Sequence, residues 1–210
     1  PDADVDNAVS ALMGAAYGSC GERCMAIPLL VCVGDEVGDA VIAGLKTEIA
    51  KMKVGPGTDN SNDMGPLVTK PHFEKVKAYV DSGVAEGATL VVDGRTVKVA
   101  GHEEGYFLGA CLFDNVKPGM KIYQEEIFGP VLAVTTFKDE AEALAIANDT
   151  LYGLGAGVWS RNGNVAYRMG RAIKAGRVWT NCYHAYPAHA AFGGYKQSGI
   201  GRERSEEHTS

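Results

Sequence analysis

The sequence predicts an α/β protein with a mostly parallel sheet and helices on both faces. Strand-length apolar runs alternate with amphipathic stretches of helical period, and the segments between them are rich in Gly, Pro, Asp and Asn. Parallel strands need crossover connections of helical length, and such crossovers bury the sheet between two layers of helices. Strands and helices in this alternation therefore favour a layered α/β architecture.

The first half of the chain predicts three helices and three strands. The first helix carries acidic residues at its start, where a helix N-terminus favours negative charge. The expected helices span residues 3–19, 35–52 and 70–86, and the expected strands span residues 25–33, 89–92 and 107–113. Turn residues dominate residues 55–66, which we expect to form a long loop.

The second half repeats the strand–helix–strand pattern. The expected strands span residues 131–137, 156–159 and 177–181, and the expected helices span residues 139–148 and 164–175. Gly176 ends the last helix. No segment resembles a linker, so we expect one domain over residues 1–203.

Composition excludes several classes of protein. The chain has 210 residues and a net charge of −6 without a basic run, which argues against a nucleic-acid partner. No apolar stretch is long enough for a membrane span, and the acidic start does not resemble a signal peptide. Five irregularly spaced cysteines favour a reducing cytoplasmic location over a disulfide framework. No metal site is expected, because no second Cys or His pair accompanies Cys20 and Cys24.

Cys24 is the first candidate for chemistry. It follows a break after the first helix and precedes a predicted buried strand, so it lies at an edge of the sheet, where sites of open α/β folds gather. Arg23 and nearby backbone N–H groups would favour the reactive thiolate. The alternative interpretation is an inert buried cysteine, which is the commoner fate of a free thiol.

Two further motifs are candidates for ligand contact. Glu125 and Glu126 precede Phe128 and a Gly-Pro turn, and a carboxylate there could accept hydrogen bonds from ribose hydroxyls. The alternative is a solvated acidic turn. Phe192 begins a Phe-Gly-Gly-Tyr-Lys loop, whose glycine pair permits close approach of a ligand or of another backbone; the alternative is an ordinary surface turn.

These three motifs, in this order, resemble the catalytic half of the NAD(P)-dependent aldehyde dehydrogenase superfamily. The resemblance covers residues 1–203 and depends on the runs Gly21 to Ala26, Glu125 to Pro130 and Phe192 to Gly199. It implies that Cys24 is the nucleophile, which attacks the aldehyde to form a thiohemiacetal and then a thioester. It also implies that Glu126 holds the nicotinamide ribose, that Phe128 packs near the nicotinamide ring and that Phe192 lines the substrate tunnel.

The resemblance also implies a cofactor, an acyl acceptor and partners. The cofactor is NAD or NADP, the acceptor is water or coenzyme A, and the full-length parent is a homo-oligomer. The family's general-base Glu, its oxyanion-stabilising Asn and its nucleotide-binding domain would lie before residue 1. We therefore expect the 210-residue polypeptide alone not to turn over aldehyde with NAD.

Two subfamilies are represented within the resemblance. Residues 1–130 resemble methylmalonate-semialdehyde dehydrogenase, which makes an acyl-CoA product, and residues 131–203 resemble acetaldehyde and betaine-aldehyde dehydrogenases. We interpret the chain as a chimera joined at the shared Glu-Ile-Phe-Gly-Pro run, natural or from sequence assembly. Residues 204–210 depart from the family and are expected to be a non-native tail without structure of its own. Reading one DNA molecule across codons 120–140 tests the chimera.

Two other functions stay open from the residues alone. A cysteine acyltransferase or hydrolase that does not use NAD would need a histidine to activate Cys24, and His184 and His189 are the candidates. The other alternative is a catalytically dead fragment or an assembly module that packs against full-length subunits.

Overall fold

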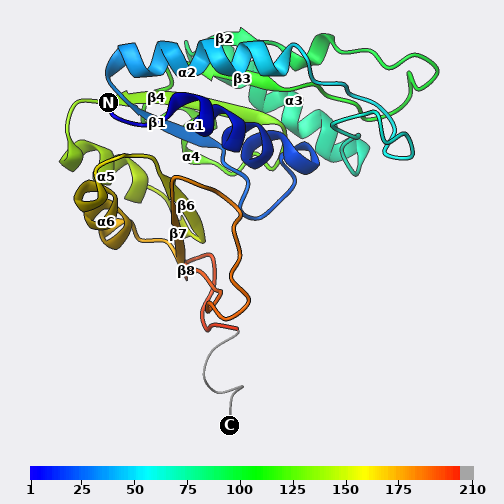
Figure 1. The fold of residues 1–210 in the computed structure, drawn as a ribbon. Helices are drawn as coiled ribbons and strands as arrows, with labels where there is room; N and C mark the ends of the chain where they lie inside the picture. Colours follow the sequence, from blue (N-terminus) through cyan, green and yellow to red (C-terminus); the bar gives the residue numbers. More distant parts are fainter. Residues whose placement is uncertain (204–210) are drawn as a thin grey trace. The chain divides into compact units, whose positions relative to one another are not determined.

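A computed structural model describes residues 1–203 of the chain; the tail expected at residues 204–210 lies outside the described residues. The chain divides into two compact units, and Figure 1 follows both through the sequence. The larger unit comprises residues 12–136. Among the described residues, the smaller unit comprises residues 1–11 and 137–203.

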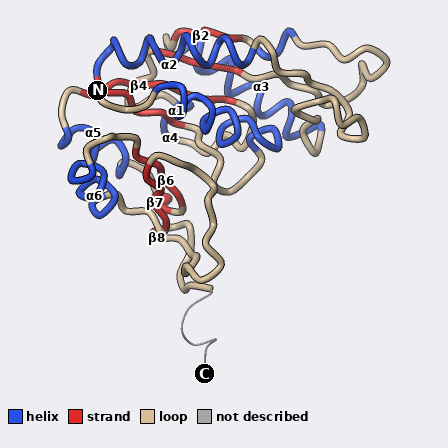
Figure 2. The backbone as a smooth tube through the Cα atoms, in the orientation of Figure 1, coloured by secondary structure: helices blue, strands red, loops and turns tan. Residues whose placement is uncertain are grey.

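The larger unit is built around a four-stranded sheet. The order of the strands is β1-β4-β3-β2; β3 and β4 are parallel, and β2 pairs antiparallel with β3. The strands are β1 (Leu29–Val33), β2 (Thr89–Val92), β3 (Cys111–Asp114) and β4 (Val131–Phe137). The helices are α2 (Gly34–Ile49), α3 (Lys70–Ala85) and the short α4 (Lys121–Gln124). Figure 2 shows the long loop that joins α2 to α3.

Helices cover both faces of this sheet. A Cβ atom added to Gly38 of α2 would lie 3.5 Å from the Thr136 side chain, and one added to Gly83 of α3 would lie 3.0 Å from the Phe113 ring. Phe113 pairs in register with Ala133, so these two side chains share a face. Ala133 and Thr136 are three residues apart in one strand and therefore point to opposite faces. The predicted fold class is thus confirmed.

The chain enters the larger unit through an irregular helix. α1 (Val5–Leu12) continues as a π-helix over Met13–Tyr17 and a 3-10 turn over Gly18–Gly21. Tyr17 is buried, and its hydroxyl donates to the Cys111 carbonyl at 3.2 Å. Burial raises the pKa of the Tyr17 phenol well above its usual range. This anchor fixes the end of the helix next to the sheet.

The smaller unit contains two short sheets. β6 (Gly155–Val158) is parallel to β7 (Arg177–Thr180), and β5 (Tyr152–Gly153) is antiparallel to β8 (Tyr195–Lys196). Two helices accompany them: α6 (Gly163–Ala172), which packs on β6 and β7, and α5 (Glu140–Asn148), which packs on α6.

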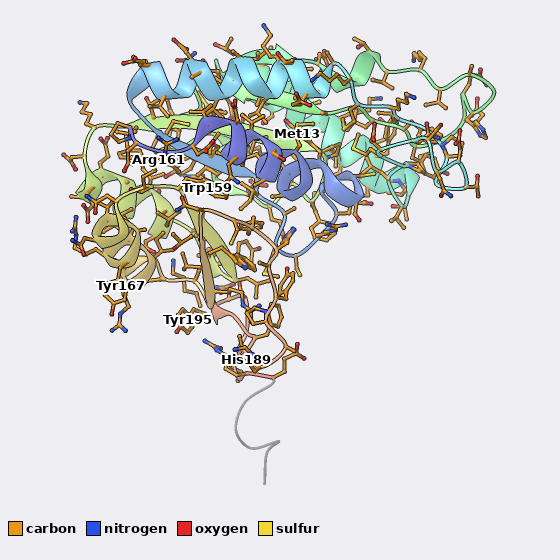
Figure 3. The ribbon with its side chains drawn as sticks, in the orientation of Figure 1. Met13, Trp159, Arg161, Tyr167, His189 and Tyr195 are labelled. Carbon is orange, nitrogen blue, oxygen red and sulfur yellow. The ribbon has the colours of Figure 1, made fainter. Side chains whose placement is uncertain are left out.

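Residues 1–11 are held within the smaller unit by side-chain hydrogen bonds. The Trp159 indole, labelled in Figure 3, donates to Asn7 Oδ1 at 2.9 Å. The Asp2 carboxylate accepts from the Ser160 hydroxyl at 3.0 Å and from the Asn162 N–H at 2.9 Å. The start of the chain is therefore tied to the loop between β6 and α6.

Several predicted elements need correction. The strand expected from Met25 begins only at Leu29, because Ala26 N–H donates to Arg23 C=O in a turn and Pro28 precedes the first ladder residue. The helix expected over residues 3–19 is α-helical only over Val5–Leu12, and the strand expected from residue 107 begins at Cys111. Neither α4 nor the β5–β8 pair is predicted from the sequence. α2, α3, β2 and β4 agree with prediction to within a few residues.

Neither a membrane span nor a metal site is found in residues 1–203. No described helix is both long and apolar enough to cross a bilayer. No three His, Cys, Asp or Glu side chains of the described residues gather in a group that could hold a metal ion.

Candidate active site

Cys24 lies in an exposed turn of the larger unit. The turn follows three successive residues with left-handed backbone: φ is 50° at Ser19, 58° at Cys20 and 67° at Gly21. Non-glycine residues adopt this region at a cost, and such strain concentrates at functional sites. The reversal brings Cys24 out of the core and onto the surface.

Three other cysteines are buried and unsuited to nucleophilic chemistry. Burial raises the pKa of the Cys20 thiol to about 11, with a smaller contribution from the Glu22 charge. Burial likewise raises the pKa of Cys32 to about 12 and that of Cys111 to about 11. Cys182, in the smaller unit, is half-buried. Among the five thiols, Cys24 is thus the exposed one.

The second motif lies directly beside the turn that carries Cys24. A Cβ atom on Gly21 would overlap the carbonyl oxygen of Gly129, so the two backbones are in contact there. Glu126 and Phe128, in the same short segment, are both exposed, and Phe128 has a left-handed φ of 58°. The structure therefore brings together the first and second motifs, which lie about a hundred residues apart in sequence.

Helix α3 supplies side chains to this region that the sequence analysis missed. His72 Nε2 lies 2.6 Å from the Phe128 carbonyl oxygen and 3.6 Å from Glu22 Oε1. The Tyr79 hydroxyl donates to Glu125 Oε2 at 2.6 Å. No motif contains His72 or Tyr79, and the sequence predicts only that both lie in a helix over residues 70–86.

Phe192 lies in the smaller unit, and its surroundings are described there alone. Its backbone exchanges hydrogen bonds of 3.0 and 2.8 Å with Glu203, and the Arg177 guanidinium lies 5.5 Å from its ring centre. A Cβ atom on Gly176 would overlap the Gly193 carbonyl oxygen, so the Gly-Gly pair passes tightly against the residue before β7. The close backbone approach expected of this loop is therefore made to another backbone.

The two histidines of the acyltransferase alternative are also in the smaller unit. His184 lies among aromatic rings, with ring centres 4.6 Å from Tyr183 and 6.0 Å from Trp179. His189, labelled in Figure 3, is exposed on a loop. His184 is therefore part of an aromatic cluster, and His189 is part of a surface loop.

Comparison with known proteins decides the family. The model of the aldehyde dehydrogenase family matches residues 1–210. The chain belongs to the aldehyde dehydrogenase family. Malonate-semialdehyde dehydrogenase from Pseudomonas aeruginosa is 56% identical over 202 residues, which cover 96% of this chain and 41% of that protein. Aldehyde dehydrogenase B from Escherichia coli is 49% identical over 203 residues, 96% of this chain and 39% of the relative.

Solved aldehyde dehydrogenases have the same fold over most of the chain. The methylmalonate-semialdehyde dehydrogenase from Oceanimonas doudoroffii matches with a TM-score of 0.92 and 47% identity, covering 96% of this chain and 41% of its own. The betaine aldehyde dehydrogenase from Staphylococcus aureus, solved with NAD+, matches with a TM-score of 0.91 and 38% identity, covering 96% of this chain and 40% of its own. The chain thus spans about two fifths of the length of the aldehyde dehydrogenases that it matches.

Both kinds of relative that the motifs indicated are among these matches. Semialdehyde dehydrogenases and betaine aldehyde dehydrogenases each match across nearly the whole chain, not across one half of it. The recognised family is therefore confirmed, and the mixed ancestry of the two halves stays a prediction.

Proposed function

We propose that this chain carries the nucleophile of an NAD(P)-dependent aldehyde dehydrogenase and works as part of a longer enzyme. The observation that carries the proposal is the exposed Cys24 turn in contact, through Gly21 and Gly129, with the segment that contains Glu126 and Phe128. An accessible thiol beside a cofactor-binding segment is the arrangement that covalent aldehyde oxidation requires.

The chemistry begins at the Cys24 sulfur. Its thiolate adds to the carbonyl carbon of the aldehyde, and a C–S bond forms while the C=O π electrons move to oxygen. The N–H of Cys24 makes no hydrogen bond within residues 1–203, so it is available to donate to that oxyanion. After hydride loss the acyl group is held on Cys24 as a thioester, and water or coenzyme A then releases it.

The residues beside Cys24 suit a nicotinamide cofactor. Glu126 presents an exposed carboxylate, which accepts hydrogen bonds as ribose hydroxyls require, and Phe128 is 38% exposed, which leaves ring surface for an aromatic ligand. NAD or NADP, when bound, accepts the hydride. In this proposal Glu126 binds and orients the ribose, and Phe128 limits the movement of the ring.

The substrate class follows from Arg23 and from the names of the relatives. Arg23 is exposed and adjacent to Cys24, and its Nε donates to the Ser19 hydroxyl at 3.1 Å, so the guanidinium keeps further donors for a ligand. Matched relatives act on malonate and methylmalonate semialdehydes, which carry a carboxylate. We propose that Arg23 pairs with such a carboxylate.

The substrate proposal is tested with Arg23→Gln in the full-length protein. The KM should rise about tenfold for a semialdehyde and stay within about twofold for an uncharged aldehyde of equal length, because only the first loses a charged hydrogen bond. Equal changes for both substrates would contradict the assignment. We propose that Phe192 lines the substrate tunnel. Phe192→Leu should therefore change the KM for both substrates by a similar factor.

The enzymatic proposal is tested with Cys24→Ser in the full-length protein, with Cys182→Ser as the matched control. Aldehyde-dependent NADH formation should disappear in the first variant and persist in the second. Retained activity in Cys24→Ser would overturn the proposal and favour another chemistry. The isolated 210-residue chain should form no NADH at a steady rate, and it should join full-length subunits if homo-oligomer contacts lie within it.

A further inference from the structure

One face of helix α3 contacts the segment Glu125–Gly129 along its length. His72, Val76 and Tyr79 are spaced four and three residues apart, which places them on one helical face. Each meets a different part of the segment. His72 contacts the Phe128 carbonyl, a Cβ on Gly129 would lie 2.7 Å from the Val76 side chain, and Tyr79 contacts Glu125. The face therefore acts as a continuous support.

The start of α3 fixes where His72 lies. Thr69 is the N-cap, and its hydroxyl accepts from the His72 N–H at 3.3 Å. Pro71 occupies the first turn, where its ring restricts the backbone and no N–H is needed. His72 is thus the third residue of a capped helix, which holds its ring against the neighbouring segment.

The hydrogen bond from His72 compensates for strain at Phe128. Because a carbonyl oxygen only accepts, Nε2 of His72 carries the proton and donates to Phe128. The two rings also lie edge to face, with centres 6.2 Å apart. A left-handed φ of 58° is unfavourable for Phe, and such a conformation persists only where its surroundings hold it. His72 is the side chain that holds this carbonyl.

His72 also reaches the segment that carries the nucleophile. Its Nε2 lies 3.6 Å from Glu22 Oε1, and the two side chains are only 22% and 10% exposed. The same Glu22 oxygen lies 3.5 Å from the Val68 N–H, just before α3 begins. Glu22 is two residues from Cys24, so one imidazole contacts both the Cys24 turn and the Phe128 backbone.

We propose that His72 and Tyr79 are positioning residues for cofactor binding. In this proposal both side chains act through neighbouring residues and not on the reacting atoms. His72 fixes the backbone of Phe128, and Tyr79 fixes the side chain of Glu125, so that Glu126 between them presents its carboxylate in one orientation. The proposal deepens the function proposed above and rests on the assignment of Glu126 and Phe128 to the cofactor.

Kinetics of the full-length protein provide the first test. His72→Leu and Tyr79→Phe each remove one hydrogen bond, and each should raise the KM for NAD about fivefold while the KM for aldehyde stays within about twofold. His72→Gln should restore most of the loss, because its amide nitrogen can donate where Nε2 does. A uniform loss in kcat with unchanged KM for NAD would overturn the proposal.

His102→Leu is the matched control. His102 is also a histidine of the larger unit with an edge-to-face phenylalanine neighbour, Phe107, at 6.1 Å, but it is exposed in the loop between β2 and β3 and is not part of α3. This variant should leave both KM values unchanged. An equal effect of His102→Leu and His72→Leu would contradict a specific role for His72.

Hydrogen–deuterium exchange of the 210-residue chain separates this proposal from the proposed enzymatic function. Amides of the peptide from Glu125 to Val131 should exchange about fivefold faster in His72→Leu and in Tyr79→Phe, and at the original rate in His72→Gln and His102→Leu. This readout needs no catalysis. Unchanged exchange in both variants would overturn the positioning role, even in an active enzyme. Faster exchange in the two variants, together with no aldehyde activity in the unmodified full-length protein, would contradict the proposed enzymatic function. It would still agree with the positioning of the segment by His72 and Tyr79.

Discussion

Gly21 and Gly129 lie with their backbones in contact, although they come from motifs far apart in the sequence. A Cβ atom on Gly21 would overlap the Gly129 carbonyl oxygen, and Gly21 also has a left-handed φ of 67°. Only glycine satisfies both conditions at low cost. This contact sets the distance between the Cys24 turn and the Glu126 segment, on which the proposed chemistry depends.

Gly21→Ala should therefore destabilise the larger unit more than Gly34→Ala does. We expect the free energy of unfolding to fall by about 2–4 kcal/mol, because of backbone strain and overlap with Gly129. Gly34→Ala should lose only about 1–2 kcal/mol, because its φ of 68° is left-handed but no atom lies within 4 Å. Urea unfolding measures both. Equal losses would show that the contact with Gly129 contributes nothing.

Thiol accessibility predicts an order of alkylation. Iodoacetamide should modify Cys24 first and the half-buried Cys182 second, while Cys20, Cys32 and Cys111 stay unmodified until the chain unfolds. Burial and the raised pKa values of the three buried thiols both suppress their thiolates near neutral pH. Peptide mapping by mass spectrometry gives the order. Early modification of Cys20 would contradict the buried contact of its sulfur with the Gly65 carbonyl at 2.9 Å.

The same buried thiols predict a loss of stability at alkaline pH. The folded-state pKa of Cys32, about 12, lies above the ordinary value of 9.0, so between these values the unfolded chain loses a proton that the folded chain keeps. The contribution of this thiol to the free energy of unfolding is therefore fully present below pH 9. It is lost as pH rises, by at most about 1.4 kcal/mol per pH unit for each such group. Cys20 and Cys111 act in the same direction up to about pH 11.

Cys32→Ala isolates one of these contributions. Urea midpoints measured at several values between pH 8 and 11 should fall less steeply in the variant than in the unmodified chain, whatever its absolute stability. Lysine and exposed tyrosine titrations are common to both proteins and cancel in the comparison. Parallel slopes would mean that the Cys32 thiol titrates normally in the folded state.

Gly176 and Gly170 form a matched pair in the smaller unit. Gly176→Ala should cost at least about 2 kcal/mol, because its Cβ would overlap the Gly193 carbonyl and displace the loop that contains Phe192. Gly170→Ala should stabilise by about 0.5–1 kcal/mol, because Gly170 is inside α6 and a Cβ there would make an ordinary contact with Val178 at 3.9 Å. The midpoint temperature of thermal unfolding should therefore fall in Gly176→Ala and rise in Gly170→Ala. A shift in one direction for both would contradict the packing described.

Elements with a long periodic pattern could be predicted from the sequence. The apolar stripe of α2 and the β-branched run of β4 were identified because local propensity and burial agree there. The Met25–Pro28 segment was assigned to a strand because apolar composition does not distinguish a strand from a turn stabilised by one backbone hydrogen bond. The π-helix at Met13–Tyr17 ends at Tyr17, whose hydroxyl donates to the distant Cys111 carbonyl, and a sequence pattern does not contain such a long-range contact.

The candidate site could be predicted only in part. Cys24, Glu126 and Phe128 are candidates from the sequence because they stand in motifs that resemble those of the family. Their supports were not identified: His72 and Tyr79 act through a backbone carbonyl and a neighbouring carboxylate, and such contacts depend on how α3 packs. Positioning contacts across the fold leave no local signature in the sequence.

Trapping the acyl group tests directly whether Cys24 is the nucleophile. The full-length protein is mixed with aldehyde and NAD, quenched in acid, digested and mapped by mass spectrometry. We expect an acyl addition on the peptide that contains Cys24, dependent on NAD and absent in Cys24→Ser. NADH formation accompanied by an acyl addition on another residue, or undiminished NADH formation by Cys24→Ser, would contradict it.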